Sequence, residues 1–534
     1  MTDFENFAGY LIGLIRAHRH VRMPVRWWRT GSGDEGAPQV GVKKGGMTGM
    51  RRTGWTAVVI AGTLLMAVCL SGPPVGATTG TEGTASIYAA AATFSTPPDT
   101  GSIVEPLSAH SSDLVSYGYV EDEYFAAGTA HAFRATASPS NGRWTIAPTT
   151  AAAYRTRIIV RRPSSPAHFS GTVVVEWMNE SAGESAPDWD YLNPELMQSG
   201  DAYVAVSAQA LGVEGGKPIL GSTTAGGTKG LVQTDPARYG TLHHPGDQYA
   251  LDIFAQIGLA LRSPTDHVLG NLHPRHVVAV GESQSAFYLT TFADALQPHI
   301  HAFDGIFIHS RGGSGAALNG SSIAKNLSGA QRIRTDLDVP VFMFETQTDL
   351  IILGYAPAQQ PNTSRIRTWE VAGTSHADAF LVGPAASALG CTVPVNSGPQ
   401  HEVVQAAFAA FIKWVVQGTP PPSPPPFRLS SEKPPTLALD RFGNVIGGVR
   451  TPAVDTPVST LSGAPPSGAN ALCSLFGSTT AFTPQMLTSI YQSKAEYLAK
   501  YTASLDKAIK GGFILSADRA ELLAQANQVP FPAA

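Results

Sequence analysis

Charge is scarce in this 534-residue chain. Charged residues make up only 14%, and neither sign dominates, because 36 Lys and Arg face 40 Asp and Glu. Such a composition builds no basic face, so we expect no nucleic-acid partner. The hydrophobic fraction of 43% is that of a globular protein and excludes a disordered chain. The length is sufficient for one large folded domain with extensions.

Motifs that bind phosphates or metals are also missing. The chain has no GxxxxGK[ST] loop and no dinucleotide fingerprint after an expected strand. His243, His244 and Asp247 resemble metal ligands at first sight, but Pro245 and Gly246 break any helical face that would align them. We therefore expect no metal and no organic cofactor, and keep His244 only as a candidate pocket residue.

The N-terminal 77 residues differ from the rest. Arg51 and Arg52 precede an uncharged run, Trp55–Leu70, and the small residues of Val75-Gly76-Ala77 follow it. At about 16 residues, the run is short for a membrane span, which needs about 20. This pattern is typical of a secretory signal, so we expect a secreted or envelope-associated protein that starts near Thr78, without a stable membrane span. A retained anchor is the alternative.

Only two of the three cysteines, Cys391 and Cys473, lie beyond that segment, and neither has zinc-site spacing. Two cysteines in an exported protein are typically paired. We expect a disulfide that closes a loop of roughly 80 residues. Two buried, unpaired thiols are the alternative.

Strand-like and helix-like segments alternate from about residue 170. Near-continuous apolar runs predict strands at 172–178, 202–209, 276–281, 303–310, 339–346 and 364–373. Helical periodicity predicts helices at 246–263, 283–296 and 401–418. Strands that alternate with helices predict a mostly parallel sheet covered on both faces, an α/β fold.

Composition divides the chain into four parts. We expect an N-terminal extension with the secretory signal at 1–77, a Thr/Ala/Gly-rich linker at 78–100, a catalytic domain at 101–426, and a C-terminal extension at 427–534 that packs on it. The stretch from 101 to 170 is irregular in pattern, with strand-like pieces such as 156–162. The prolines at 419–426 form a stiff segment that marks a boundary.

The most informative motif follows the expected strand 276–281. Gly281-Glu282-Ser283-Gln284-Ser285 has the form of a nucleophile elbow, the sharp turn between strand and helix that lifts a serine hydroxyl above the sheet edge. Gly281 satisfies the need for a small residue before the serine, and Ser285 replaces the usual second glycine. The backbone N–H of Gln284, at the helix start, should point at a developing oxyanion.

An acid and a base should follow the serine, in the order Ser, acid, His. Asp349 lies just beyond the expected strand 339–346, and Glu345, within that strand, is the alternative acid. Of the two later histidines, His376 lies in a glycine-containing loop after the next strand, whereas His401 opens a helix. We expect Asp349 and His376 to complete a triad.

The second oxyanion donor should come from the loop after the strand 172–178. The backbone N–H of Asn179 or of Glu180 is the candidate, and the sequence does not choose between them. Further residues that could shape the pocket are Asp188, Trp189 and His309.

These segments together resemble a family of secreted bacterial α/β-hydrolases. The resemblance runs from about residue 100 to 530 and is carried by VVVEWMNESAG, DPARYGTLHHPGDQYALDIFAQ, VGESQSA, GTSHAD, GNVIGGVRTP and CSLFGST. It implies the α/β-hydrolase fold, with Ser283, Asp349 and His376 as the triad. It also implies that residues 427–534 belong to the enzyme. The family's substrate is poorly defined.

The sequence therefore predicts an exported serine hydrolase that cleaves carboxylic esters through an acyl-enzyme. We expect a small-molecule or lipid-like ester as substrate. An amidase or an acyltransferase with the same triad is one alternative, and a non-catalytic binding protein with this fold is another.

Overall fold

The computed structural model describes residues 90–107, 112–220, 227–264, 267–321, 330–383 and 385–531. All of them belong to one compact unit. The expected secretory signal in residues 1–77 lies outside the described residues. Within the described ranges, no helix combines the length and the apolar character needed to cross a bilayer.

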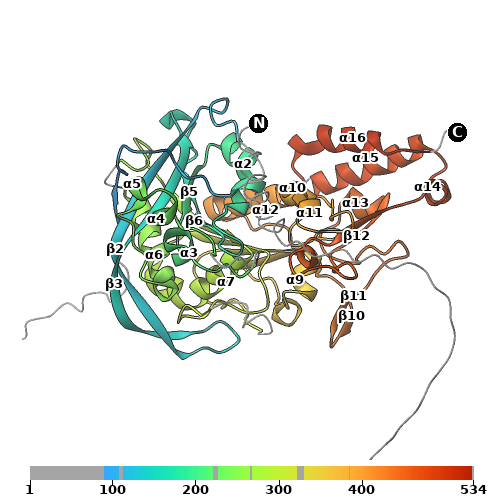
Figure 1. Ribbon diagram of the computed structural model, residues 1–534. Helices are drawn as coiled ribbons and strands as arrows, with labels where there is room; N and C mark the ends of the chain where they lie inside the picture. Colours follow the sequence, from blue (N-terminus) through green and yellow to red (C-terminus); the bar gives the residue numbers. More distant parts are fainter. Residues whose placement is uncertain are drawn as a thin grey trace, which may run out of the picture. The chain divides into compact units, whose positions relative to one another are not determined.

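One large sheet organises the described part of the chain (Figure 1). Its order is β1-β2-β3-β5-β4-β6-β7-β8-β9. The strands are β1 (Thr93–Ser95), β2 (Tyr119–Ala137), β3 (Thr145–Pro163), β4 (Thr172–Trp177), β5 (Ala202–Val206), β6 (His276–Glu282), β7 (Gly305–His309), β8 (Val341–Glu345) and β9 (Ile366–Glu370). From β5 through β4 and β6 to β9 all neighbours are parallel, whereas β1, β2, β3 and β5 pair antiparallel.

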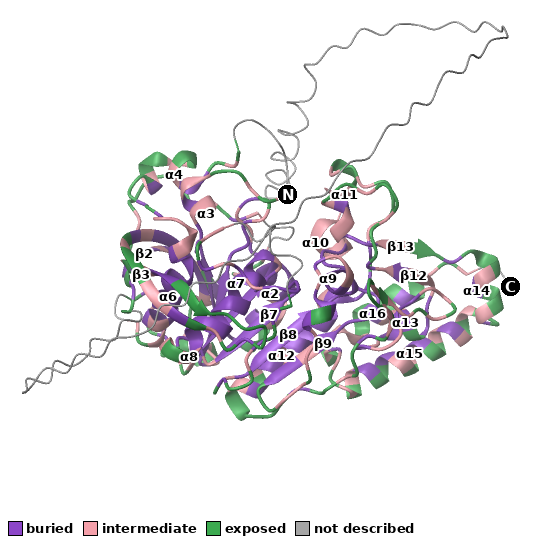
Figure 2. Ribbon diagram, turned by 90° about the horizontal axis from the view of Figure 1, so that it is seen from below, coloured by how far each residue is buried: buried purple, intermediate pink, exposed green. Residues whose placement is uncertain are grey.

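The central strands are apolar throughout because both faces of the sheet are covered. Val173 and Val175 lie in one hydrophobic core, and Val174 lies in the other. The first core is closed by α6 (Ala250–Arg262) and α7 (Gln284–Thr291), and the second by α2 (Pro187–Ser199) and α12 (Gln400–Gln417). Figure 2 shows the strands β7 to β9 as buried. The mostly parallel sheet predicted from the sequence is therefore present.

The remaining helices are short connections or belong to the C-terminal part. They are α3 (Ala210–Glu214), α4 (Leu231–Thr234), α5 (Pro236–Tyr239), α8 (Gln297–Ile300), α9 (Gln347–Ile351), α10 (Ala379–Val382), α11 (Ala385–Ala388), α13 (Pro452–Asp455), α14 (Pro484–Ile490), α15 (Lys494–Lys510) and α16 (Arg519–Gln528).

The direction of the chain reverses at the centre of the sheet. From β4 it moves through α2 to β5, then returns past β4 through α6 to β6, and continues outward to β9. Right-handed crossovers that run in opposite directions place their helices on opposite faces, which agrees with the positions of α2 and α6. The carboxyl ends of β4 and β6 are thus neighbours at a topological switch point, where open α/β sheets hold their binding crevice.

The N-terminal part is more regular than the sequence predicts. The stretch expected to be irregular contains β2 and β3, which pair along almost their whole length. Residues 90–100, the described end of the expected linker, contain β1, which pairs with β2. Strand β3 is continuously buried only over 156–161, the segment that includes its pairing with β5, and most of its residues before 156 are half-buried or exposed, so its apolar run is short.

The C-terminal extension packs directly on the sheet. Helices α15 and α16 contribute to the same core as α2 and α12, and the ring of Phe513 contacts Trp369 of β9 at 4.9 Å between centroids. The proline segment also contacts this strand, because the Trp369 indole N–H donates to the carbonyl of Pro422 at 2.9 Å. Figure 2 shows buried and exposed residues alternating along α15, as in an amphipathic helix.

A disulfide joins Cys391 to Cys473 across 82 positions, as the sequence predicts. Cys391 lies in the segment between α11 and α12, and Cys473 begins a short 3-10 turn of the C-terminal extension. The bond ties that extension to the segment that follows β9.

We expect loss of this bond to destabilise the protein, because it removes a constraint on the unfolded chain. The double substitution Cys391→Ser, Cys473→Ser should lower the free energy of unfolding by up to about 4 kcal/mol, measured by denaturant unfolding. A reductant should lower the stability of the parent protein and leave that of the double variant unchanged. Equal stability of the parent with and without reductant would contradict the prediction.

Candidate active site

Ser283 occupies a strained turn between β6 and α7. Its φ of 58° and ψ of −118° are unusual for a residue with a side chain. Its N–H donates to the His309 carbonyl at 2.9 Å. A Cβ on Gly281 would lie 2.9 Å from the Cβ of Ser285, so the turn requires glycine there. Ser283 is half-buried, whereas every other residue from 277 to 297 is buried. The turn therefore exposes this hydroxyl selectively.

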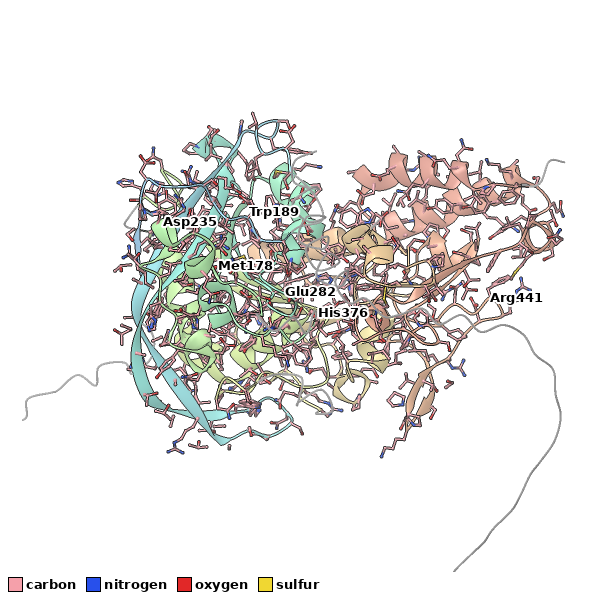
Figure 3. All side chains as sticks on the ribbon, in the orientation of Figure 1. Met178, Trp189, Asp235, Glu282, His376 and Arg441 are labelled. Carbon is pink, nitrogen blue, oxygen red and sulfur yellow. A yellow bond between two sulfur atoms is a disulfide. The ribbon has the colours of Figure 1, made fainter. Side chains whose placement is uncertain are left out.

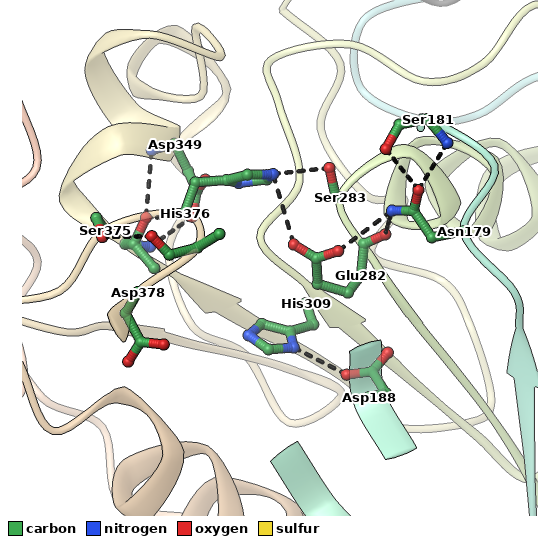
Figure 4. A network of polar contacts seen from close by, with 12 residues as sticks. Asn179, Ser181, Asp188, Glu282, Ser283, His309, Asp349, Ser375, His376 and Asp378 are labelled. Carbon is green, nitrogen blue, oxygen red and sulfur yellow. Dashed lines mark hydrogen bonds and ion pairs between the residues drawn. The ribbon is translucent and has the colours of Figure 1, made fainter. Parts of the chain in front are cut away.

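Three side chains from separate elements meet at this turn (Figure 4). Nε2 of His376, from the loop after β9, lies 2.7 Å from Ser283 Oγ. Nδ1 of His376 lies 2.7 Å from Oδ1 of Asp349, which belongs to α9. With the proton on Nδ1, the imidazole donates to Asp349 and accepts from the serine hydroxyl. This is the contact order of a nucleophile, its base and an orienting acid.

The alternative acid and base do not reach this site. Neither carboxylate oxygen of Glu345 has a hydrogen-bond partner among the described residues, and the Nδ1 position of His376 is taken by Asp349. His401 lies on α12, stacked on Phe380 with 4.2 Å between centroids.

Asp349 is oriented by the turn that carries it. Its Oδ2 accepts from both the N–H and the hydroxyl of Thr346, each at 2.7 Å, which leaves Oδ1 for the imidazole. Burial lowers the pKa of His376, but the carboxylates of Asp349 and Glu282 raise it more, so the net shift is upward. The site thus favours the protonated imidazole that forms when the ring accepts a proton.

The two loop residues proposed as oxyanion donors differ in the structure. The N–H of Asn179 donates to the Ser185 carbonyl at 2.8 Å in an antiparallel bridge, so the expectation for this residue is wrong. The N–H of Glu180 instead donates to Oε1 of Gln284 at 3.1 Å. Among the described residues, no acceptor faces the N–H of Gln284 at the start of α7. Glu180 and Gln284 remain the two backbone donors beside Ser283.

Comparison with known proteins places the chain in a family. A family model described as alpha/beta hydrolase domain matches residues 92–524. The chain belongs to this α/β-hydrolase family. The match confirms the family and the fold class predicted from the sequence.

Solved structures with esterase names are similar to parts of this α/β-hydrolase at low identity. A glucuronoyl esterase from Solibacter usitatus is 10% identical, with a TM-score of 0.26, over 47% of this chain and 76% of that one. A fungal esterase from Rhizomucor miehei is 10% identical, with a TM-score of 0.27, over 55% and 86%. Est1E from Butyrivibrio proteoclasticus is 9% identical, with a TM-score of 0.27, over 54% and 99%. No curated protein sequence matches significantly.

Two of the four candidate pocket residues, His309 and Asp188, form a buried pair. Nδ1 of His309, at the end of β7, lies 2.8 Å from Oδ1 of Asp188 at the start of α2, and both side chains are fully buried. Burial lowers the pKa of His309 to about 4, so its imidazole is neutral at neutral pH. Neither residue is placed to contact a substrate directly.

Trp189 and His244 are not pocket residues, which corrects the expectation for both. Trp189 packs in the core, 4.6 Å from the ring of Tyr203. Both ring nitrogens of His244 are engaged by the backbone, since Nε2 lies 2.9 Å from the Ala208 carbonyl and Nδ1 accepts from the Gly246 N–H. The described residues contain no group of three or more His, Cys, Asp or Glu placed to hold a metal ion.

The C-terminal extension of this α/β-hydrolase holds the loop that carries Asp349. Gly463 donates its N–H to Oε1 of Gln347 at 2.9 Å, and its carbonyl accepts from the Thr348 hydroxyl at 2.8 Å. A Cβ on Gly463 would lie 2.5 Å from the Cβ of Gln347 and 2.8 Å from the Thr348 N. Only a glycine at position 463 allows this contact. Asp349 directly follows Thr348 in the chain.

The same extension holds the loop that carries His376. The Ser375 hydroxyl donates to the Phe476 carbonyl at 3.1 Å, and the Ala377 N–H donates to the Leu475 carbonyl at 3.3 Å. These two residues flank His376. The disulfide predicted from the sequence implies that the extension lies near this loop, and these contacts agree with it.

We expect Gly463→Ala to displace Asp349 and to reduce labelling of Ser283 by a fluorophosphonate. A misplacement of about 1 Å in a catalytic group can cost about 10²-fold, so the labelling rate should fall by at least an order of magnitude. Gly468→Asn is the control, because Gly468 lies in the same extension, has a φ of 74° that asparagine tolerates, and has no neighbour within 4 Å of a Cβ. Equal rates in both variants would contradict the prediction.

Proposed function

We propose that this α/β-hydrolase is an exported serine hydrolase that cleaves carboxylic esters through an acyl-enzyme. The observation that carries the proposal is the contact series at Ser283, in which His376 lies 2.7 Å from both the serine hydroxyl and Asp349. The positive φ of Ser283 at a turn between strand and helix supports the role of nucleophile. On this proposal, residues 427–534 belong to the catalytic unit.

The proposed reaction has two steps. The Ser283 Oγ attacks the ester carbonyl carbon while its proton passes to Nε2 of His376, and Asp349 holds the resulting imidazolium in place. The proton then passes from Nε2 to the departing alkoxide, which leaves as the alcohol. A water molecule attacks the acyl-enzyme by the same route and releases the acid.

The developing oxyanion would be stabilised by the N–H groups of Glu180 and Gln284. Because the Glu180 N–H donates to the Gln284 side chain, that side chain must turn away when a substrate carbonyl binds. The same groups would serve an amidase or an acyltransferase, so the leaving group and the acceptor are outcomes of the test. A binding protein would have no activated serine.

A fluorophosphonate probe should label Ser283, because it reacts with an activated serine whatever the substrate. Ser283→Ala should abolish both labelling and hydrolysis of p-nitrophenyl acetate, measured on protein whose circular dichroism matches the parent. Asp349→Asn should lower kcat by about 10⁴-fold, because the imidazole loses its orienting acceptor. Glu345→Gln is the matched control and should lower kcat only slightly. Labelling that persists in Ser283→Ala would place the nucleophile elsewhere.

Export rests on the N-terminal sequence pattern alone. We expect the protein recovered from the medium or the envelope to begin near Thr78, because Val75-Gly76-Ala77 offers small residues at the exit of the apolar run. N-terminal sequencing of the exported protein measures this. Recovery of the chain in membranes with Trp55–Leu70 intact would support a retained anchor instead.

A further inference from the structure

Glu282, the residue before Ser283, is a buried carboxylate beside the imidazole of His376. Its Oε1 lies 3.5 Å from Nε2, the ring nitrogen that also contacts the serine hydroxyl. Figure 3 shows the two residues close together, and Figure 4 shows Asp349 at the other ring nitrogen. The imidazole therefore lies between two carboxylates, one at each nitrogen.

The orientation of Glu282 is set by the loop after β4. Nδ2 of Asn179 donates both to the Glu282 carbonyl, at 3.1 Å, and to Oε2 of its carboxylate, at 3.2 Å. Because Oε2 accepts the hydrogen bond from Asn179, Oε1 is the oxygen that faces His376. The Asn179 side chain thus acts beside the site, although its backbone N–H does not.

The other groups that face Glu282 do not supply a positive charge at neutral pH. His309 is its register partner on β7, and that imidazole is neutral at neutral pH and paired with Asp188. The side chains of Asp349 and Asp188 are acids and supply no positive charge. Among the described residues that interact with the Glu282 carboxylate, only His376 can compensate its charge near pH 7.

Burial raises the pKa of Glu282 to about 7. The imidazoles of His376 and His309 lower it, and the carboxylates of Asp188 and Asp349 raise it. Glu282 is therefore ionised above about pH 7 and neutral below it.

We propose that Glu282 is a positioning residue that stabilises the imidazolium of His376 while the serine proton resides on Nε2. The inference rests on the proposed function and deepens it. As Oγ bonds to the acyl carbon, the proton moves to Nε2, and the cation is held between Asp349 and Glu282. Glu282 accepts no proton; the leaving group takes it from Nε2.

The alternative is a purely structural role, in which Glu282 only anchors Asn179. Glutamine is nearly isosteric, and its amide oxygen could still accept from Asn179. A structural role would therefore leave the titration of His376 unchanged in Glu282→Gln. An electrostatic role moves it, because loss of the negative charge lowers the pKa of His376, and the neutral base persists to lower pH.

The test is the pH dependence of Ser283 labelling by a fluorophosphonate, which needs no knowledge of the substrate. In Glu282→Gln, the acid limb of the labelling rate should move to lower pH by about one unit, the low end of the effect of an opposite charge at this range. The plateau rate should fall several-fold because the imidazolium loses one of its two carboxylates.

Glu370→Gln is the matched control. Glu370 is also buried at the end of a strand, with a pKa raised to about 7 by burial, but its carboxylate bonds to Gln359 and to the Phe427 N–H and has no contact with His376. The acid limb of the labelling rate in Glu370→Gln should coincide with that of the parent protein. Glu282→Asp retains the charge at a greater distance, so its limb should lie between those of the parent and Glu282→Gln.

The outcomes separate this inference from the proposed function. If Ser283 is labelled and the acid limbs of Glu282→Gln and Glu282→Asp coincide with that of the parent, Glu282 is structural and the inference is overturned while the function stands. If Glu282→Gln fails to fold, the shift of the acid limb in Glu282→Asp decides between the electrostatic and the structural role. A parent protein that the probe does not label overturns the proposed function itself.

Discussion

The site depends on the parallel pairing of the strands from β4 to β9, because parallel strands bring all their carboxyl ends to one edge of the sheet. Segments far apart in the sequence thereby become neighbours. The residues at or just beyond the carboxyl ends of these strands are, in the order β4, β6, β7, β8 and β9, Glu180, Ser283, His309, Asp349 and His376. Reversal of the chain between β4 and β6 then places the first two beside each other.

Burial at this edge raises the free energy of an ionised group, so each buried carboxylate either accepts hydrogen bonds or becomes neutral. Asp349 accepts two hydrogen bonds from Thr346 and one from His376. Glu345, without partners among the described residues, has a pKa raised far above its ordinary value by burial. Glu282 is intermediate, since it has Asn179 as donor and His376 as counter-charge. Glu282, Asp349 and His376 are buried, so these pairs interact more strongly than they would in solvent.

The C-terminal extension completes the support of these groups. Gly463 contacts the acid loop, and Leu475 and Phe476 contact the base loop. Cys473 lies two residues before Leu475, so the disulfide anchors the segment that holds the base loop. The proposed function would need Asp349 and His376 held within a fraction of an ångström, and loops alone do not provide that rigidity. The family match up to residue 524 agrees with this integration.

Local patterns in the sequence were sufficient for the elbow at Ser283, the central strands, the disulfide, and the order in which Asp349 and His376 follow the serine. These features depend on neighbours in the chain or on the edge that parallel strands share. The hydrogen-bond partners of the Asn179 and Glu180 N–H groups and the burial of Trp189 and His244 depended on the tertiary structure, because the direction of a loop N–H or a side chain is set by partners distant in sequence. For the same reason, only the fold brought the Glu282 carboxylate, visible in the elbow motif, to the far nitrogen of His376.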